Sequence, residues 1–198
     1  ERPMLSRAQI LDALRELDVH ARAAQRLVDL SIYGGAALVL AFDARIATRD
    51  VDAVIRSNAS FARDLCHQIA LERGWPEDWL NDGVKGYLSA HESMELMREF
   101  PGSECGGLRV HLASAEYLFA MKCMAMRPEG IDGSHDISDI AALARRIGLS
   151  DAAEAMALVE QFYPQRQIPP KVAFGVEEIM ERLQAAQIAN TRGEDPVA

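Results

Sequence analysis

Two glycines and two aspartates carry the chemistry that this sequence most clearly suggests. Gly34 and Gly35 follow an apolar segment, and backbone without side chains lets a triphosphate approach the amide groups at a helix N-terminus. In an extended strand, side chains two positions apart face the same way, so Asp50 and Asp52 are expected to share one side while Val51 turns inward. Two such carboxylates can bind one hard cation, Mg²⁺ or Mn²⁺, whose shell keeps water and substrate phosphates. The pattern therefore predicts a phosphate and metal site.

The order of these residues is more informative than either pair. A glycine pair alone is typical of a turn, and Asp-x-Asp alone is typical of a solvated strand edge. Here a strand, the glycine pair, a helix, Arg45, Thr48 and the two aspartates follow one another, and this order resembles the nucleotidyltransferase superfamily. The resemblance implies that the glycines, Arg45 and Thr48 bind the nucleotide and that the two aspartates bind the metal and serve catalysis.

A lysine and two further aspartates form a second motif. Lys122 lies in the segment 118–127, and Asp136 and Asp139 follow with D-x-x-D spacing. The arrangement is similar to a signature of the AbiE type of abortive-infection nucleotidyltransferase toxins, where a helix offers a lysine and the next helix begins with D-x-x-D. The resemblance implies that Lys122 neutralises nucleotide phosphates and that Asp139 or Asp136 orients Lys122 or assists deprotonation of the attacking hydroxyl. The alternative is a solvated lysine, a dipole-favoured acid at a helix start and a surface acid.

One strand departs from the superfamily pattern. Many members place a third carboxylate on a later central strand, which completes two-metal chemistry. The corresponding strand here, Leu108–Leu112, contains no acid, and His111 is a poor replacement that is expected to face solvent or a buried partner. Three explanations stay open: the D-x-x-D helix substitutes, one metal suffices, or the protein binds nucleotide without turnover.

The segment Asp78-Trp79-Leu80-Asn81-Asp82 is also similar to a recurring segment in one uncharacterised bacterial branch of the superfamily. Its tryptophan is expected to be a core anchor rather than part of a nucleotide pocket. Asn81 and Asp82 are expected to cap or shape a turn.

Composition limits the setting and the partners. The chain has 198 residues, 49% of them hydrophobic, and a formal net charge of -9, which argues against broad nonspecific binding to DNA or RNA. Its three cysteines are widely spaced without a C-x-x-C pair, which favours a reducing, cytoplasmic location. No apolar run approaches the roughly 20 residues that span a bilayer, so no membrane association is expected. Zinc-hydrolase, serine-hydrolase and P-loop motifs are absent from the sequence.

Periodicity and turn signals predict an α+β fold with a helical C-terminal half, and the resemblance implies a nucleotidyltransferase-like mixed sheet flanked by helices. The expected core covers residues 1–112, including an N-terminal helix capped by Ser6, and a helical region packed on it covers residues 113–198. Strands are expected at 27–33, 49–55 and 108–112. Helices are expected at 36–42, 59–73 and 135–147, after Ser114, from Ser150 to Tyr163, and through Leu183, with a frayed tail at 190–198.

The resemblance implies metal-dependent transfer of a nucleoside monophosphate from an NTP to an acceptor hydroxyl. The acceptor would be RNA, with tRNA a candidate, or a protein. It also implies a toxin of a toxin–antitoxin or phage-defence system with a cognate antitoxin as partner. The alternative is a catalytically degenerate protein of the same fold that binds a nucleotide or a protein partner without turnover.

Overall fold

The chain forms two compact units. The computed structural model describes residues 2–42, 45–127 and 135–192, with side chains described to residue 189. Unit 1 contains residues 1–88 and 93–114, and unit 2 contains residues 89–92 and 115–198. The end of the expected frayed tail lies outside the described residues.

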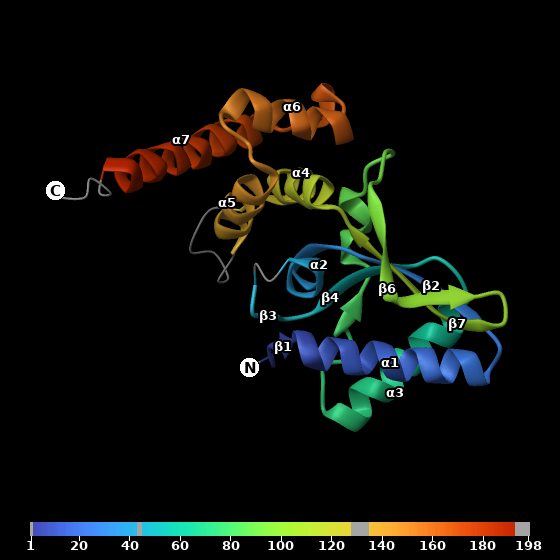
Figure 1. The fold of residues 1–198 in the computed structure, drawn as a ribbon. Coiled ribbons are helices and arrows are strands. Elements are labelled where there is room, and N and C mark those ends of the chain that lie inside the picture. Colours follow the sequence, from blue (N-terminus) through green and yellow to red (C-terminus); the bar gives the residue numbers. More distant parts are fainter. Residues whose placement is uncertain (1, 43–44, 128–134, 193–198) are drawn as a thin grey trace. The chain divides into compact units, whose positions relative to one another are not determined.

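Strands and helices of unit 1 precede an all-helical series, as Figure 1 shows. In chain order the elements are β1 (Leu5–Ser6), α1 (Arg7–Ala23), β2 (Leu27–Ile32), α2 (Gly34–Ala41), β3 (Ala47–Thr48), β4 (Val51–Ile55), α3 (Ala59–Arg73), β5 (Leu80–Asn81), the 3-10 helix η1 (Gly83–Tyr87), β6 (Met94–Ser103), β7 (Gly106–Ala113), α4 (Ala115–Ala125), α5 (Asp136–Ile147), α6 (Ala152–Phe162), the 3-10 helix η2 (Gln165–Gln167) and α7 (Pro170–Arg192). The expected α+β class, with a mixed sheet and a helical C-terminal half, is confirmed. None of the described helices combines the length and apolar character needed to cross a membrane.

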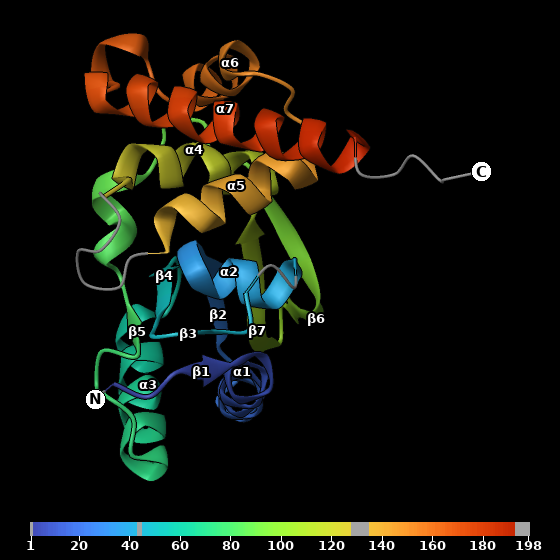
Figure 2. The ribbon, with the colours of Figure 1, turned by 90° about the vertical axis from the view of Figure 1, so that its left-hand side faces the viewer.

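A mixed five-stranded sheet in the order β5-β4-β2-β7-β6 forms the centre of unit 1. β2 runs parallel to β7 and antiparallel to β4, while β4 runs parallel to the two-residue strand β5. The two views of the ribbon place α1 and α3 along one face of the sheet and α2 on the other face (Figures 1 and 2). Alternate apolar residues of the three central strands, such as Leu30, Ala53 and Val110, are buried.

Local signals explain most of the element boundaries in unit 1. Ser6 caps α1 through a capping box, in which its hydroxyl accepts from the Gln9 amide at 3.3 Å and the Gln9 side chain accepts from the Ser6 amide at 2.9 Å. Gly74 ends α3 with φ +64°. Val19 is an apolar residue of α1 that does not join its buried side, since it is 62% exposed.

The longest strand, β6, was not expected from the sequence. It lies at an edge of the sheet, and its pairing with β7 shifts register between Leu96 and Pro101. An edge strand needs only one paired side, so it tolerates proline and a bulge that would disrupt a central strand. The resulting irregular burial hides the two-residue period.

Unit 2 consists of α4–α7 and η2, together with the segment 89–92. α4 packs against α5, α6 and α7, as Figure 2 also shows. Tyr117 of α4 stacks on Phe162 of α6 with ring centroids 5.0 Å apart, and its hydroxyl accepts from the Ser89 amide at 2.8 Å. Asp151, rather than the expected Ser150, caps α6, since its carboxylate accepts from the Glu154 amide at 2.9 Å.

Candidate functional site

The turn between β2 and α2 brings a glycine directly against a carboxylate. Gly34 begins α2 with φ +59°, a conformation that L side chains rarely adopt. A β-carbon at this position would overlap the Asp52 carboxylate oxygen. Backbone conformation and space therefore both require glycine here, and the absence of a side chain allows Asp52 to lie against the turn.

Gly35 likewise leaves room for two polar side chains, those of Thr48 and Arg45. A β-carbon on Gly35 would lie 2.6 Å from the Thr48 hydroxyl and 2.7 Å from a guanidinium nitrogen of Arg45. Thr48 is buried and belongs to β3. The four sequence-predicted residues Gly34, Gly35, Arg45 and Thr48 are thus brought together with Asp52 at one end of α2.

The first turn of α2 presents backbone amides in the same place. The first amides of an α-helix lack intrahelical acceptors, and Tyr33, which precedes α2, makes no side-chain capping bond. The Tyr33 hydroxyl instead accepts from Arg56 at 2.8 Å. Amides at a helix N-terminus, together with a nearby guanidinium and a hydroxyl, are suited to an anion such as a phosphate.

Asp50 and Asp52 lie at the start of β4, with Asp50 just outside the strand. Asn81 of β5 is in register with Asp52 and leaves the sheet on the same face, and its amide donates to Asp50 Oδ2 at 3.3 Å. Arg2 lies 4.0 Å from Asp50 and also bonds Asp78, and that hydrogen bond lowers the pKa of the Asp78 carboxyl. The sequence predicted only a turn role for Asn81, and its side-chain oxygen does accept from the Gly83 amide at 3.0 Å. Its bond to Asp50 was not predicted.

These carboxylates match the donor preference of Mg²⁺ in number and type. Mg²⁺ is usually bound through one or two carboxylates, with water and substrate phosphates completing its shell. No group of three or more histidine, cysteine or acidic side chains able to hold a metal occurs in the ranges that the structure describes. A metal ion at Asp50 and Asp52 would accordingly need the phosphates of a nucleotide as further ligands.

The strand β7 supplies no third acid at the level of Asp52. Ile32 pairs with both Ala53 and Leu112, so the next position, Ala113, is level with Asp52. Ala113 is 1% exposed. His111 faces a partner, as one of the two expectations had it: its Nδ1 lies 3.3 Å from Asp29 of β2.

In unit 2, Lys122 of α4 contacts both acids of the D-x-x-D motif on α5. Its ammonium lies 3.1 Å from Asp136 Oδ1 and 2.9 Å from Asp139 Oδ2. The side chains of Asp136 and Asp139 are only 8% and 6% exposed, and that of Lys122 is 15% exposed. Arg127 adds a second cation, with its amide 3.3 Å and its Nε 3.5 Å from Asp136 Oδ2. The motif forms a nearly buried ionic cluster that joins α4 to α5.

In unit 1, the expectation that Trp79 is a core anchor is confirmed. Trp79 is fully buried, packs edge-on against Trp75 with centroids 5.2 Å apart, and donates to the Cys66 carbonyl at 2.9 Å. Cys123 is likewise buried, in the core of unit 2.

Comparison of the chain with protein-family models, curated proteins and solved structures gives no match.

Proposed function

We propose that this protein is a metal-dependent nucleotidyltransferase, with a nucleotidyltransferase-like core, that moves a nucleoside monophosphate from an NTP to an acceptor hydroxyl. The observation that carries the proposal is the packing of Asp52 against Gly34, beside Gly35, Thr48 and Arg45. A metal-binding acid and a phosphate-binding helix start are then neighbours, as transfer of a nucleotidyl group requires.

Each residue of the turn has a distinct role in this proposal. The amides of Gly34 and Gly35 bind phosphate oxygens, and Arg45 and Thr48 hold the phosphate chain from the side of β3. Asp50 and Asp52 hold Mg²⁺ or Mn²⁺, which neutralises charge on the phosphates during transfer. Asn81, through its bond to Asp50, fixes the orientation of that carboxylate.

Transfer of the nucleotidyl group needs no reactant besides the NTP and the acceptor. The acceptor oxygen forms a bond to the α-phosphorus, the bond from that phosphorus to the bridging oxygen of the β-phosphate breaks, and pyrophosphate leaves. The acceptor proton passes to a base. The roles of Lys122, Asp136 and Asp139 in phosphate binding and deprotonation stay predictions, and their mutual contacts support the part in which the acids orient Lys122.

The biological setting follows from the resemblance to AbiE-type toxins and stays part of the proposal. It comprises a bacterial toxin–antitoxin or phage-defence system, a cytoplasmic location, and tRNA, another RNA or a protein as acceptor. A cognate antitoxin would be the protein partner.

A second function, nucleotide binding without turnover, is favoured by one observation. The position of β7 level with Asp52 is the buried Ala113, so β7 adds no third acid to Asp50 and Asp52. Nucleotide binding needs the amides of Gly34 and Gly35, the Arg45 guanidinium and one metal ion. Two carboxylates are enough to hold that one metal ion.

Incubation with NTPs labelled at the α- or the γ-phosphate, Mg²⁺ and total RNA or lysate tests the proposal. We expect acceptor labelling from the α-label alone, abolished in Asp52→Asn and retained in Asp64→Asn, which changes an exposed aspartate of α3. Thermal melting without nucleotide checks that both variants fold. Stabilisation by NTP and Mg²⁺ without label transfer would establish the binding function instead. If NTP and Mg²⁺ cause neither thermal stabilisation nor label transfer, both functions are refuted.

A further inference from the structure

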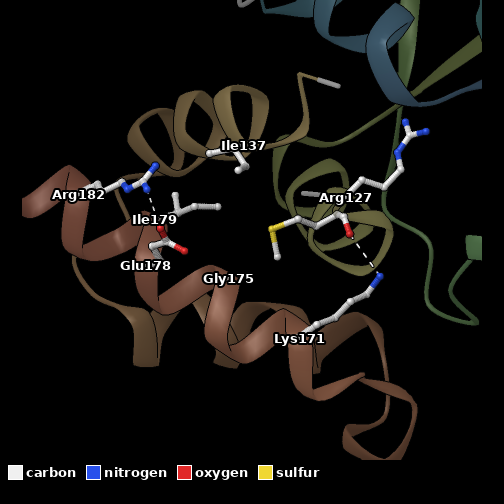
Figure 3. A pocket seen from close by; sticks show the side chains of 8 residues that line it. Arg127, Ile137, Lys171, Gly175, Glu178, Ile179 and Arg182 are labelled. Carbon is white, nitrogen blue, oxygen red and sulfur yellow. Dashed lines mark hydrogen bonds and ion pairs between the residues drawn. The ribbon is translucent and has the colours of Figure 1, made fainter. Parts of the chain in front are cut away.

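Unit 2 contains a cavity of about 190 Å³ that the proposed function does not use. It lies where the end of α4 meets α5 and α7, and Figure 3 shows the side chains around it. Its middle is apolar, formed by Met126, Ile137 and Ile179. Met126 and Ile179 are buried, at 8% and 3% exposure.

A glycine on α7 makes room for this apolar surface. A β-carbon at Gly175 would overlap the terminal methyl of Met126, with the sulfur 2.9 Å away. Gly175 therefore lets the Met126 side chain lie across α7 and form one wall of the cavity. Methionine is flexible and makes favourable contacts with aromatic rings through its sulfur.

Cations surround the apolar middle. Of the described residues that line the cavity, three are cations, Arg127, Lys171 and Arg182, and one is an acid, Glu178, although the whole chain carries a net charge of -9. Arg182 is paired with Glu178 at 2.6 Å, and Arg127 contacts Asp136.

Lys171 differs from the other two cations. Its ammonium donates to the Met126 carbonyl at 3.3 Å, and no ion pair of Lys171 occurs within the described part of the chain. Figure 3 places Lys171 and Arg182 on opposite sides of Ile179. Among the residues that the structure describes, one end of the cavity thus has a cation without a carboxylate, and the other end has the ion pair of Arg182 with Glu178.

We propose that this cavity binds a small aromatic monocarboxylate. Its carboxylate would pair with Lys171, and its ring would contact Met126, Ile137 and Ile179. The size agrees with a single ring, because a protein cavity of roughly 150 Å³ lined by apolar side chains accommodates benzene. A larger, drug-sized ligand generally needs a pocket of about 300 Å³ or more. The inference is independent of the proposed nucleotidyltransferase activity, since Met126, Ile137, Lys171 and Ile179 have no role in that activity.

Methyl NMR of the full chain with labelled methionine and isoleucine tests this proposal directly. Benzoate is the probe, and benzyl alcohol is the neutral control with the same ring. We expect benzoate to shift the methyl signals of Met126, Ile137 and Ile179 but not that of Ile46, which is 93% exposed in unit 1. Benzyl alcohol should bind at least about tenfold more weakly, as expected for loss of a charge-assisted bond.

Two variants separate the contribution of the Lys171 charge to binding from that of the cavity volume. Lys171→Met keeps the aliphatic stem and should weaken benzoate binding about tenfold or more while leaving benzyl alcohol unchanged. Gly175→Ala should weaken both probes, because it pushes Met126 into the cavity, and alanine is well tolerated in a helix. Lys85→Met, which removes a cation of η1, should change neither. Absence of shifts at the three methyl groups, equal affinity for the two probes, or benzoate affinity unchanged in Lys171→Met would each overturn the proposal.

Discussion

Replacing Gly34 by alanine should damage both stability and nucleotide binding, for a reason that can be isolated. Gly34 has φ +59° and Gly74 has φ +64°, so alanine meets nearly the same backbone strain at the two positions. No atom lies within 4 Å of a β-carbon at Gly74, whereas at Gly34 the Asp52 carboxylate occupies that space. The pair of variants therefore differs in the displacement of one aspartate.

The expected losses follow from these two contributions. The left-handed conformation costs alanine about 1–2 kcal/mol, which applies to Gly34→Ala and Gly74→Ala alike. Displacement of the Asp52 carboxylate should add about 1–3 kcal/mol of local strain to Gly34→Ala alone. At about 2–4 °C per kcal/mol for a chain of this size, Gly34→Ala should melt several degrees below Gly74→Ala.

Thermal melting with and without NTP and Mg²⁺ measures both effects. A ligand at about 100 times its Kd stabilises the native state by about 2.7 kcal/mol, and Gly74→Ala should keep this increment. Gly34→Ala should lose it, because the alanine methyl and the displaced carboxylate would obstruct the turn that we propose binds phosphate. Equal melting temperatures for the two variants, with equal nucleotide stabilisation, would show that Asp52 does not pack against Gly34.

The nearly buried cluster on α4 and α5 should respond differently from an exposed ion pair. Lys122→Met leaves two nearly buried carboxylates without their shared cation and should cost about 3–5 kcal/mol. Lys85→Met breaks the exposed pair with Asp82 and should cost less than about 1 kcal/mol in the same denaturant titration; similar losses would contradict the burial argument. Burial raises the pKa of Cys66 from 9.0 to about 12, so at pH 8 the exposed Cys105 should react with a thiol reagent far faster than Cys66. Unfolded thiols ionise from about pH 9 while the buried thiol stays protonated, so the stability that Cys66 contributes should be lost as the pH rises from 9 towards 12; a midpoint for urea unfolding that does not fall over this range would contradict the shift.

Sequence patterns predicted the parts of the fold that depend on local signals. The apolar run of β2, the glycine turn and the strand containing Asp52 were all recognisable because each has a period or a turn residue of its own. The two-residue strands and β6 were not, since a short strand has no period and an edge strand can lose its alternation at a bulge. Two residues, Leu80 and Asn81, are enough to form β5 only because β4 offers an unpaired edge.

The candidate site was predictable in its residue types but not in its contacts. The glycine pair and the Asp-x-Asp spacing pointed to Gly34 and Asp52. Nothing in the sequence indicates that the Asp52 carboxylate occupies the space that a side chain at Gly34 would fill. Asn81 was missed as a partner of Asp50 because their contact depends on the pairing of β4 with β5, which has no sequence signal. Long-range register, rather than local propensity, decided these positions.

The same register determines which acid can complete the site. Asp29 is the carboxylate of β2, but its carbonyl accepts from the Arg56 amide at 2.7 Å, so it stands opposite Arg56. That is four residues along β4 from Asp52, or about 13 Å at the rise of a strand. Asp29 is also 3.4 Å from Arg109 and 3.3 Å from His111, which hold its carboxylate where it lies. Asp29 therefore cannot share an ion with Asp52, so β2 supplies no further acid to the proposed metal site.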